Sequence, residues 1–343
     1  MNGSLSNSED GRMYSNKTGA PLYLVRFAAL LTLRAGRLEF QTLNAFTQNT
    51  FGGNPAAIVF LQYMLPDDVL EKIKDNFNQP IIVYVSPPKP GSFAYGLRWF
   101  GPRNEVSICG HGTLAAAEAI FRRLNPAGDV SRLEFDSKSG RLTAERVEDK
   151  IRIELPAATT VPASAEETLA IEGVFARALG KPGKSVGIRY AGFGGPGFKN
   201  YLLVEVEVEE GLSAWKPMVE HFVELAPRTQ ILVVTSASRK EGIAYETRMF
   251  APTIGVREDH VCGSAHCLNA PYWAEKAEAQ RVENGLASGG YTNGRPQHAK
   301  AVSQRGGDIW AMYFADKQRV QLDGNVKFVS IGMLDVADVV TVA

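Results

Sequence analysis

Two short segments of the chain carry residue types that can move a proton. The first reads Cys-Gly-His-Gly-Thr from Cys109, and the second reads Cys-Gly-Ser-Ala-His from Cys262. Each follows a strand-like segment that ends in Arg-x-Phe-x-Pro and a polar loop, and each precedes apolar residues at helical spacing. The sequence therefore predicts two diverged copies of one unit, made of a strand, a loop, a cysteine and a helix.

Each cysteine is expected at a helix N-terminus, where unpaired backbone N–H groups favour negative charge. Such a position can lower the pKa of a thiol to about 3.5–7.5. Cys109 and Cys262, facing each other across a cleft, could remove a proton from a carbon acid on one side and return one on the other. His111 and Asp259 are alternative acid or base groups in the same loops. The alternative interpretation is that both cysteines are small buried hydrophobic residues.

Glycine-rich turns elsewhere could hold an anionic substrate. Gly110 and Gly263 would let a substrate approach the backbone, and the Gly-Gly-Asn-Pro turn that contains Asn54 suits a similar approach, although a plain tight turn explains it equally well. The turn around Arg305 and Gly306 could present N–H groups and a guanidinium to an anion. The alternative for this turn is a hairpin with a solvated arginine.

Composition excludes several classes of partner. The chain has 343 residues, enough for two domains, and 37 basic residues balance 37 acidic ones. Without a basic stripe we expect neither nucleic acid nor a membrane as partner. Only three cysteines occur, which argues against a disulfide framework and for a reducing, cytoplasmic location. Cys262, His266 and Cys267 offer zinc ligands, but no second ligand pair accompanies them, so we expect no metal and no cofactor.

The domain organisation is predicted from composition shifts. Residues 1–37 are expected to form a disordered extension, whose apolar run at 21–33 is too short to span a bilayer. A basic patch there leaves a mitochondrial presequence open. Pro156 and the residues after it mark the best boundary, which separates a domain at 38–157 from one at 158–331.

Hydrophobic periodicity predicts five helices and a larger set of strands. The helices are expected at 66–76, 114–124, 165–179, 215–225 and 265–277. The strands are expected at 38–46, 57–61, 81–85, 95–100, 132–137, 141–146, 150–155, 185–190, 200–208, 229–235, 245–250, 308–314, 319–322 and 326–331.

From about Leu38 onward the chain resembles the phenazine biosynthesis (PhzF-like) family, within the superfamily of diaminopimelate epimerase and proline racemase. The resemblance implies an α/β (α+β) fold of two pseudo-symmetric domains, each a curved mixed sheet wrapped around a central helix. It also implies a cofactor-free isomerase with its active site between the domains, a homodimer, and a last strand, about 332–343, that returns to the first domain. The matching stretches are 51–57, 98–100, 105–117, 258–265 and 304–307.

The resemblance carries functional residues unevenly. The family's acid/base pair falls on His111 and Asp259, and its substrate-binding Gly-Ser turn on Gly263 and Ser264. The phenazine isomerase also uses a glutamate, and that position holds Ile81 here, so we do not expect isomerisation of a dihydro-hydroxyanthranilate. The catalytic cysteines of the epimerases and racemases instead fall on Cys109 and Cys262. The first motif also resembles that of proline racemase, and we expect Gly112, like Gly110, to contribute to substrate binding.

We therefore expect an isomerase or epimerase that acts by proton abstraction and return on a small carboxylate-bearing molecule. Two alternatives stay open. One is a non-catalytic descendant that binds a small ligand, which Ile81 supports because an aliphatic side chain cannot move a proton. The other is a lyase or cyclase that begins with the same abstraction and needs only one cysteine. Cys267 is expected to be a packing residue of its helix.

Overall fold

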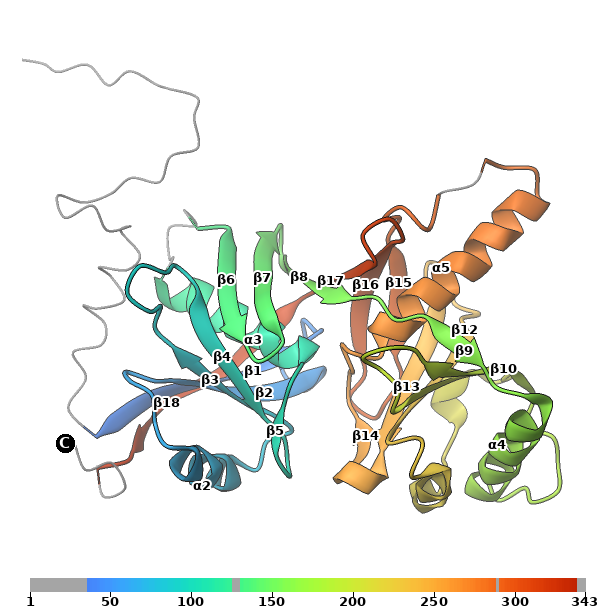
Figure 1. The fold of residues 1–343 in the computed structure, drawn as a ribbon, viewed down its shortest axis with the longest axis horizontal. Helices are drawn as coiled ribbons and strands as arrows, with labels where there is room; N and C mark the ends of the chain where they lie inside the picture. Colours follow the sequence, from blue (N-terminus) through green and yellow to red (C-terminus); the bar gives the residue numbers. More distant parts are fainter. Residues whose placement is uncertain (1–35, 125–129, 288–289, 338–343) are drawn as a thin grey trace, which may run out of the picture.

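The computed structural model describes residues 36–124, 130–287 and 290–337. Two halves of mixed strands and helices lie side by side (Figure 1). Most of the predicted N-terminal extension, residues 1–35, lies outside the described residues, and Arg37 already belongs to the first strand. Within the described ranges, no helix is long and apolar enough to cross a membrane.

The first half is formed by residues before Ala157 together with the last strand. Its elements are β1 (Arg37–Ala45), β2 (Asn54–Phe60), α2 (Asp67–Phe77), β3 (Ile82–Ser86), β4 (Tyr95–Phe100), β5 (Glu105–Val106), α3 (Gly110–Leu124), β6 (Arg132–Ser137), β7 (Gly140–Val147), β8 (Lys150–Pro156) and β18 (Val326–Asp335).

The second half is formed by the chain between these segments. Its elements are β9 (Thr160–Pro162), α4 (Ala165–Ala178), β10 (Ile188–Gly194), β11 (Tyr201–Val206), the 3-10 helices η1 (Leu212–Ala214) and η2 (Val219–Leu225), β12 (Ile231–Ala237), β13 (Tyr245–Ala251), η3 (Pro252–Ile254), β14 (Val256–Asp259), α5 (His266–Glu283), β15 (Gln297–Ala301), β16 (Gly307–Phe314) and β17 (Arg319–Gly324).

The two halves repeat one strand topology. In the first, β1–β2 is antiparallel, β2–β3 parallel, β3–β4 antiparallel and β4–β6 parallel. In the second, β10–β11, β11–β12, β12–β13 and β13–β15 repeat the same alternation. The helix α3 follows β5 as α5 follows β14. This confirms the predicted internal repeat and the pseudo-symmetric α/β architecture.

The halves are joined through strands at their boundary. β8 pairs antiparallel with β17, so the hydrogen-bonded sheet runs without a break from one half to the other. After β8 the chain enters β9, which pairs with β10, and after β17 it enters β18, which pairs with β1. The chain thus crosses between the halves twice: β9 joins the strands of the second half, and β18 returns to those of the first half. β18 pairs with β1 from Val326 onward, with one register shift between Thr42 and Leu43, so the returning strand begins earlier than the predicted residue 332.

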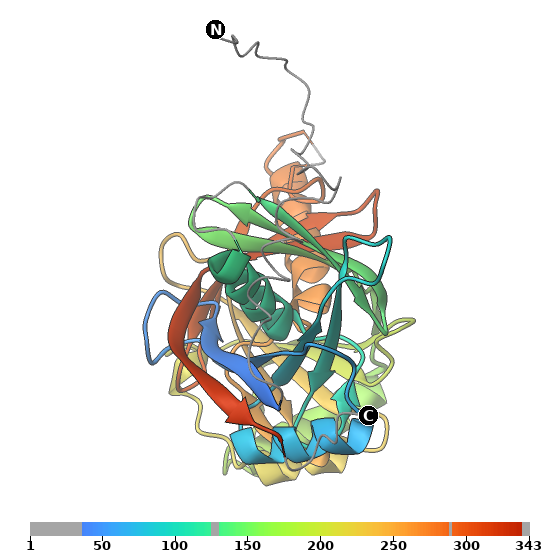
Figure 2. The same ribbon diagram turned by 90° about the vertical axis from the view of Figure 1, so that its left-hand side faces the viewer.

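Three apolar clusters hold these layers together. The largest surrounds α3 and continues across the boundary to α5, with Leu114, Phe121 and Leu268 almost fully buried. Figure 2 shows α3 enclosed by strands of the first half. A second cluster lies between α4 and strands of the second half, and a third lies between α2 and strands of the first half. The buried residues of α5 lie in its N-terminal half, from His266 to Ala274, so packing fixes the N-terminal turns of both α3 and α5.

Local sequence signals explain the helix boundaries and one wrong prediction. Ser164 and Glu167 form a capping box that starts α4, and Asn78 ends α2 in the left-handed conformation. The helix predicted at 215–225 is wrong in start and type, since η1 ends before Trp215 and only residues 219–225 are helical, as the 3-10 helix η2. Pro217 disfavours helical backbone at the residue before it, which accounts for the later start. The short strands β5, β9, β14 and β15 lie in segments for which we predicted no strand.

Candidate functional site

An arginine–glutamate pair supports each of the two cysteine motifs. Arg98 of β4 donates two hydrogen bonds of 2.8 Å to Glu105 of β5. Arg248 of β13 makes the equivalent pair with Glu258 of β14, at 2.7 and 2.9 Å. In each half the cysteine is four residues beyond this glutamate, at Cys109 and Cys262. Bidentate pairs of this kind hold two short strands in a fixed geometry, so both motif loops leave the sheet in the same way.

The two motif turns meet at their glycines. A Cβ atom on Gly263 would lie 3.0 Å from the Cα of Gly110, and the reverse distance is the same. Cys109 directly precedes α3. Cys262 instead precedes a tight turn, in which the His266 N–H donates to the Gly263 carbonyl, and only then does α5 begin. The N-terminal ends of the central helices therefore face each other at van der Waals distance.

The first motif places a thiol beside an imidazole. Cys109 Sγ lies 3.5 Å from His111 Nδ1 and accepts the Gly112 N–H at 3.4 Å. The Cys109 carbonyl accepts the Thr113 hydroxyl at 2.7 Å. Gly112 itself has no room for a ligand, since a Cβ there would meet Trp99, Val83 and the Cys109 sulfur at about 3 Å. His111 is 7% exposed, and within the described residues its Nε2 has no hydrogen-bond partner.

The second motif places a thiol beside two hydroxyl groups. Cys262 Sγ lies 3.3 Å from Ser264 Oγ, and Ser264 Oγ accepts the Tyr201 hydroxyl at 3.0 Å. Tyr201 is the first residue of β11 and is buried. No signal in the sequence predicts this role for Tyr201, because the residue lies far from the motif along the chain and nothing local marks it.

Asp259 joins the two halves at the site. Its Oδ1 accepts a 2.6 Å hydrogen bond from the Asn54 amide, which also donates to the Val261 carbonyl at 2.9 Å. These two acceptors fix the amide orientation and leave the buried Asn54 Oδ1 with no partner among the described residues. The Asp259 charge acts on Cys109, His111 and Cys262. All four predicted acid/base residues are thus brought together.

The thiol pKa values differ from the sequence expectation. Burial raises the pKa of Cys109 to about 12, with Asp259 adding to the rise and the Gly112 N–H opposing it. Burial and Asp259 likewise raise the pKa of Cys262 well above its ordinary value. The predicted lowering is therefore wrong for this site, because desolvation outweighs the hydrogen bonds at the helix ends. Burial also lowers the pKa of His111, which favours the neutral imidazole.

The Arg305 side chain forms hydrogen bonds within the protein. Its guanidinium donates to the carbonyls of Gly53 and Gly52, each at 2.8 Å. The Gly306 carbonyl accepts the Gly53 N–H at 2.9 Å, and Gly306 has a φ of +63° that suits glycine. These residues fasten the turn before Asn54 to the second half. The predicted anion-binding role is therefore replaced by a bridge that positions Asn54.

Other candidate residues are part of the core. Ile81 is 3% exposed and packs in the largest apolar cluster. Cys267 is fully buried in α5, where burial raises its pKa to about 12. His266 is also buried, with Nδ1 bonded to the Tyr245 hydroxyl at 2.9 Å. Across the ranges that the structure describes, no group of three potential ligands could hold a metal ion.

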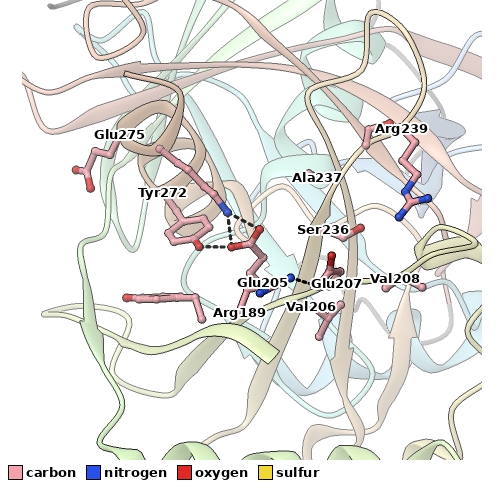
Figure 3. Close-up of a pocket in the computed structure, with 13 residues that line it drawn as sticks. Arg189, Glu205, Val206, Glu207, Val208, Ser236, Ala237, Arg239, Tyr272 and Glu275 are labelled. Atoms are coloured by element: carbon pink, nitrogen blue, oxygen red, sulfur yellow. Dashed lines mark hydrogen bonds and ion pairs between the residues drawn. The ribbon is translucent and has the colours of Figure 1, made fainter. Parts of the chain in front are cut away.

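A cavity of about 670 Å³ lies elsewhere, between α5 and the strands β10, β11 and β12 (Figure 3). Its charges are largely paired internally, with Lys276 and the Tyr272 hydroxyl on Glu205 and Arg189 on Glu207. None of the predicted site residues is among its lining residues. Glu275 and Arg239 also line this cavity, at its opposite sides (Figure 3). We place the candidate active site at the meeting of the two motifs, because the predicted acid/base residues gather there.

Comparison with known proteins gives consistent matches over most of the chain. The family model described as phenazine biosynthesis-like protein matches residues 43–332. An uncharacterized isomerase from Pseudomonas aeruginosa is 32% identical over 298 residues, which cover 87% of this chain and 98% of the relative. A human phenazine biosynthesis-like domain-containing protein is 30% identical over 311 residues, covering 87% and 99%.

Solved structures share the architecture. A phenazine biosynthesis protein of the PhzF family from Enterococcus faecalis matches with a TM-score of 0.69 and 26% identity, over 87% of this chain and 99% of the other. A hydroxyproline epimerase from Agrobacterium vitis matches with a TM-score of 0.54 and 8% identity, over 89% and 94%, and shares the fold. The matched residues include both cysteine motifs. The chain therefore belongs to the phenazine biosynthesis-like family.

Proposed function

We propose that the protein is a cofactor-independent isomerase or epimerase that moves a proton on a small carboxylate-bearing molecule, at the site between its two halves. The observation that carries this proposal is the meeting of the two motifs at Gly110 and Gly263, with Asp259 beside both of them. Relatives named as isomerases support the reaction class. The substrate would bind against the helix N-termini, whose N–H groups stabilise a carboxylate and the charge that develops on it.

The raised pKa values of the two thiols support a division of roles among the acid/base groups. A thiol with a pKa of about 12 is protonated at neutral pH, so Cys109 is suited to give a proton rather than to take one. The same holds for Cys262. Asp259 is then the candidate base, since it is the carboxylate that contacts the site. It would take the proton from the carbon next to the substrate carboxylate, and the electron pair would move into that carboxylate.

The second half of the reaction returns a proton. A thiol proton from Cys109 or Cys262 would pass to the substrate carbon, which leaves a thiolate and a protonated Asp259. Transfer of that proton to the thiolate through solvent would restore the starting state. Two buried atoms that have no partner among the described residues, His111 Nε2 and Asn54 Oδ1, lie at the site and would be satisfied by substrate. With Cys109 as donor to Nδ1, Nε2 carries the proton and can donate to a carboxylate.

Solvent isotope exchange tests this proposal. A panel of small amino acids, hydroxy acids and unsaturated carboxylates would be incubated in D₂O, and the loss of C–H signals followed by proton NMR. We expect exchange with at least one compound, and a loss of at least about 100-fold in Cys109→Ser or Cys262→Ser. Cys267→Ala is the matched control and should retain exchange, because this third cysteine lies in the core of α5. Equal exchange in all three variants would contradict the proposal.

A second candidate function is favoured by one observation. Ile81, at the position where the resemblance places a catalytic glutamate, is buried in the core and cannot take part in proton transfer. This residue is consistent with a non-catalytic protein that binds a small carboxylate. Thermal stabilisation by a compound of the panel, without any exchange of its C–H groups, would favour binding over catalysis.

A further inference from the structure

Three residues form a hydrogen-bonded chain that ends at the second thiol. The Tyr201 hydroxyl donates to Ser264 Oγ at 3.0 Å, and Ser264 Oγ lies 3.3 Å from Cys262 Sγ. Tyr201 is 7% exposed, and its ring packs edge-on against Phe198 with centroids 5.2 Å apart. Burial raises the pKa of the Tyr201 hydroxyl, and negative charge at Cys262, Cys267 or Asp259 raises it further, so this group lies near the site. Its place is fixed by β11 rather than by the motif itself.

The donor and acceptor in each hydrogen bond from Tyr201 through Ser264 to Cys262 follow from the number of hydroxyl protons. A serine hydroxyl has one proton and can accept two hydrogen bonds. Once Ser264 Oγ accepts the Tyr201 proton, its own proton is left for the sulfur, which is the other contact of this oxygen in the described residues. A thiolate is a better acceptor of that proton than a thiol, since bonds to charged acceptors are stronger.

We propose that Tyr201 is a positioning residue of this site, and that it holds the Ser264 hydroxyl so that it donates to the Cys262 sulfur when the thiol has given up its proton. This inference rests on the proposed function, in which Cys262 becomes a thiolate. The need for such support is clear from the surroundings of the sulfur. Burial and Asp259 both oppose a negative charge there, while Ser264 and the Ala265 N–H favour it.

The two thiols differ in their hydrogen-bond partners, so Cys109 can serve as an internal reference for the reactivity of Cys262. Cys109 is contacted by His111 Nδ1 and the Gly112 N–H, and the structure places no serine–tyrosine pair on it. Loss of the Tyr201 hydroxyl should therefore change the reactivity of Cys262 and leave that of Cys109 unchanged. A general loosening of the site would change both.

The experiment compares alkylation rates of the two cysteines in one sample. The folded full-length protein would be treated with iodoacetamide at pH 8.5, and the labelling of each cysteine peptide followed by mass spectrometry. In Tyr201→Phe we expect the rate ratio of Cys262 to Cys109 to fall about 3- to 10-fold, as for loss of one hydrogen bond to the thiolate. Ser264→Ala should lower the ratio at least as much, and adding Tyr201→Phe to it should cause no further fall.

Tyr245→Phe is the matched control. Tyr245 is a buried tyrosine of the same half whose hydroxyl contacts His266 Nδ1 and not Ser264, so this variant should keep the wild-type ratio. A Tyr201→Phe ratio within twofold of wild type, or an increased one, would overturn the inference. The readout needs no turnover, so it can fail while isotope exchange is observed, or succeed while none is found.

Discussion

Replacement of Gly263 by alanine tests directly whether the two motif turns touch. The added Cβ would lie 3.0 Å from the Gly110 Cα and 3.4 Å from the His111 nitrogen, and all of these neighbours are backbone atoms at the start of α3. They cannot rotate away as a flexible side chain could, so the halves must move apart by a few tenths of an ångström. Overpacking of this kind costs about 1–3 kcal/mol of unfolding free energy.

The free energy of unfolding would be measured by urea titration with tryptophan fluorescence. Gly173→Ala is the matched control, because Gly173 lies within α4 and a Cβ there would meet only the end of Arg177 at 3.5 Å. Alanine is favoured over glycine in a helix by about 0.5–1 kcal/mol, so this variant should be more stable than wild type. If Gly263→Ala were as stable as wild type, the turns would not be in contact and the proposed site would lose its geometry.

Two further predictions concern the bridge and the first thiol. Arg305→Lys should lower the unfolding free energy by about 1–3 kcal/mol in the same titration, because two hydrogen bonds to backbone carbonyls are lost. Arg319→Lys, on an exposed pair with Glu154 at 3.6 Å, should change it by less than about 0.5 kcal/mol. Since the pKa of Cys109 is about 12, its alkylation rate should rise about tenfold per pH unit from pH 7 to 9, and a plateau in that range would contradict the burial argument.

Local sequence signals predicted the two cysteine motifs, but they did not predict the residues that surround and position them. The repeated Arg-x-Phe-x-Pro segments and the two cysteine turns are local, and they identified the two units whose helix N-termini meet in the structure. The roles of Arg305 and Tyr201 could not be predicted, because their partners lie in distant segments. The same is true of the pKa direction at Cys109, which depends on how deeply the folded chain buries the sulfur.

The fold shows the same division. Apolar alternation located most strands, while β5, β9 and β14 were missed because they have only 2, 3 and 4 residues. β15 was missed because its sequence is largely polar and its parallel partner β13 lies far along the chain. The segment at 215–225 has helical spacing, yet only residues 219–225 are helical, as the 3-10 helix η2 that packs against α4. The start of β18 is set by its pairing with β1, and no local sequence signal predicts that pairing.

The most direct test of the account is hydrogen exchange into a substrate by Asp259→Asn. This change removes the charge and the base while keeping the size of the side chain, so the turn next to Asn54 should keep its shape. With a compound that the wild-type protein exchanges in D₂O, we predict a loss of about 100-fold or more. Exchange at the wild-type rate in this variant would contradict the central claim that Asp259 and the two cysteine turns form one proton-transfer site.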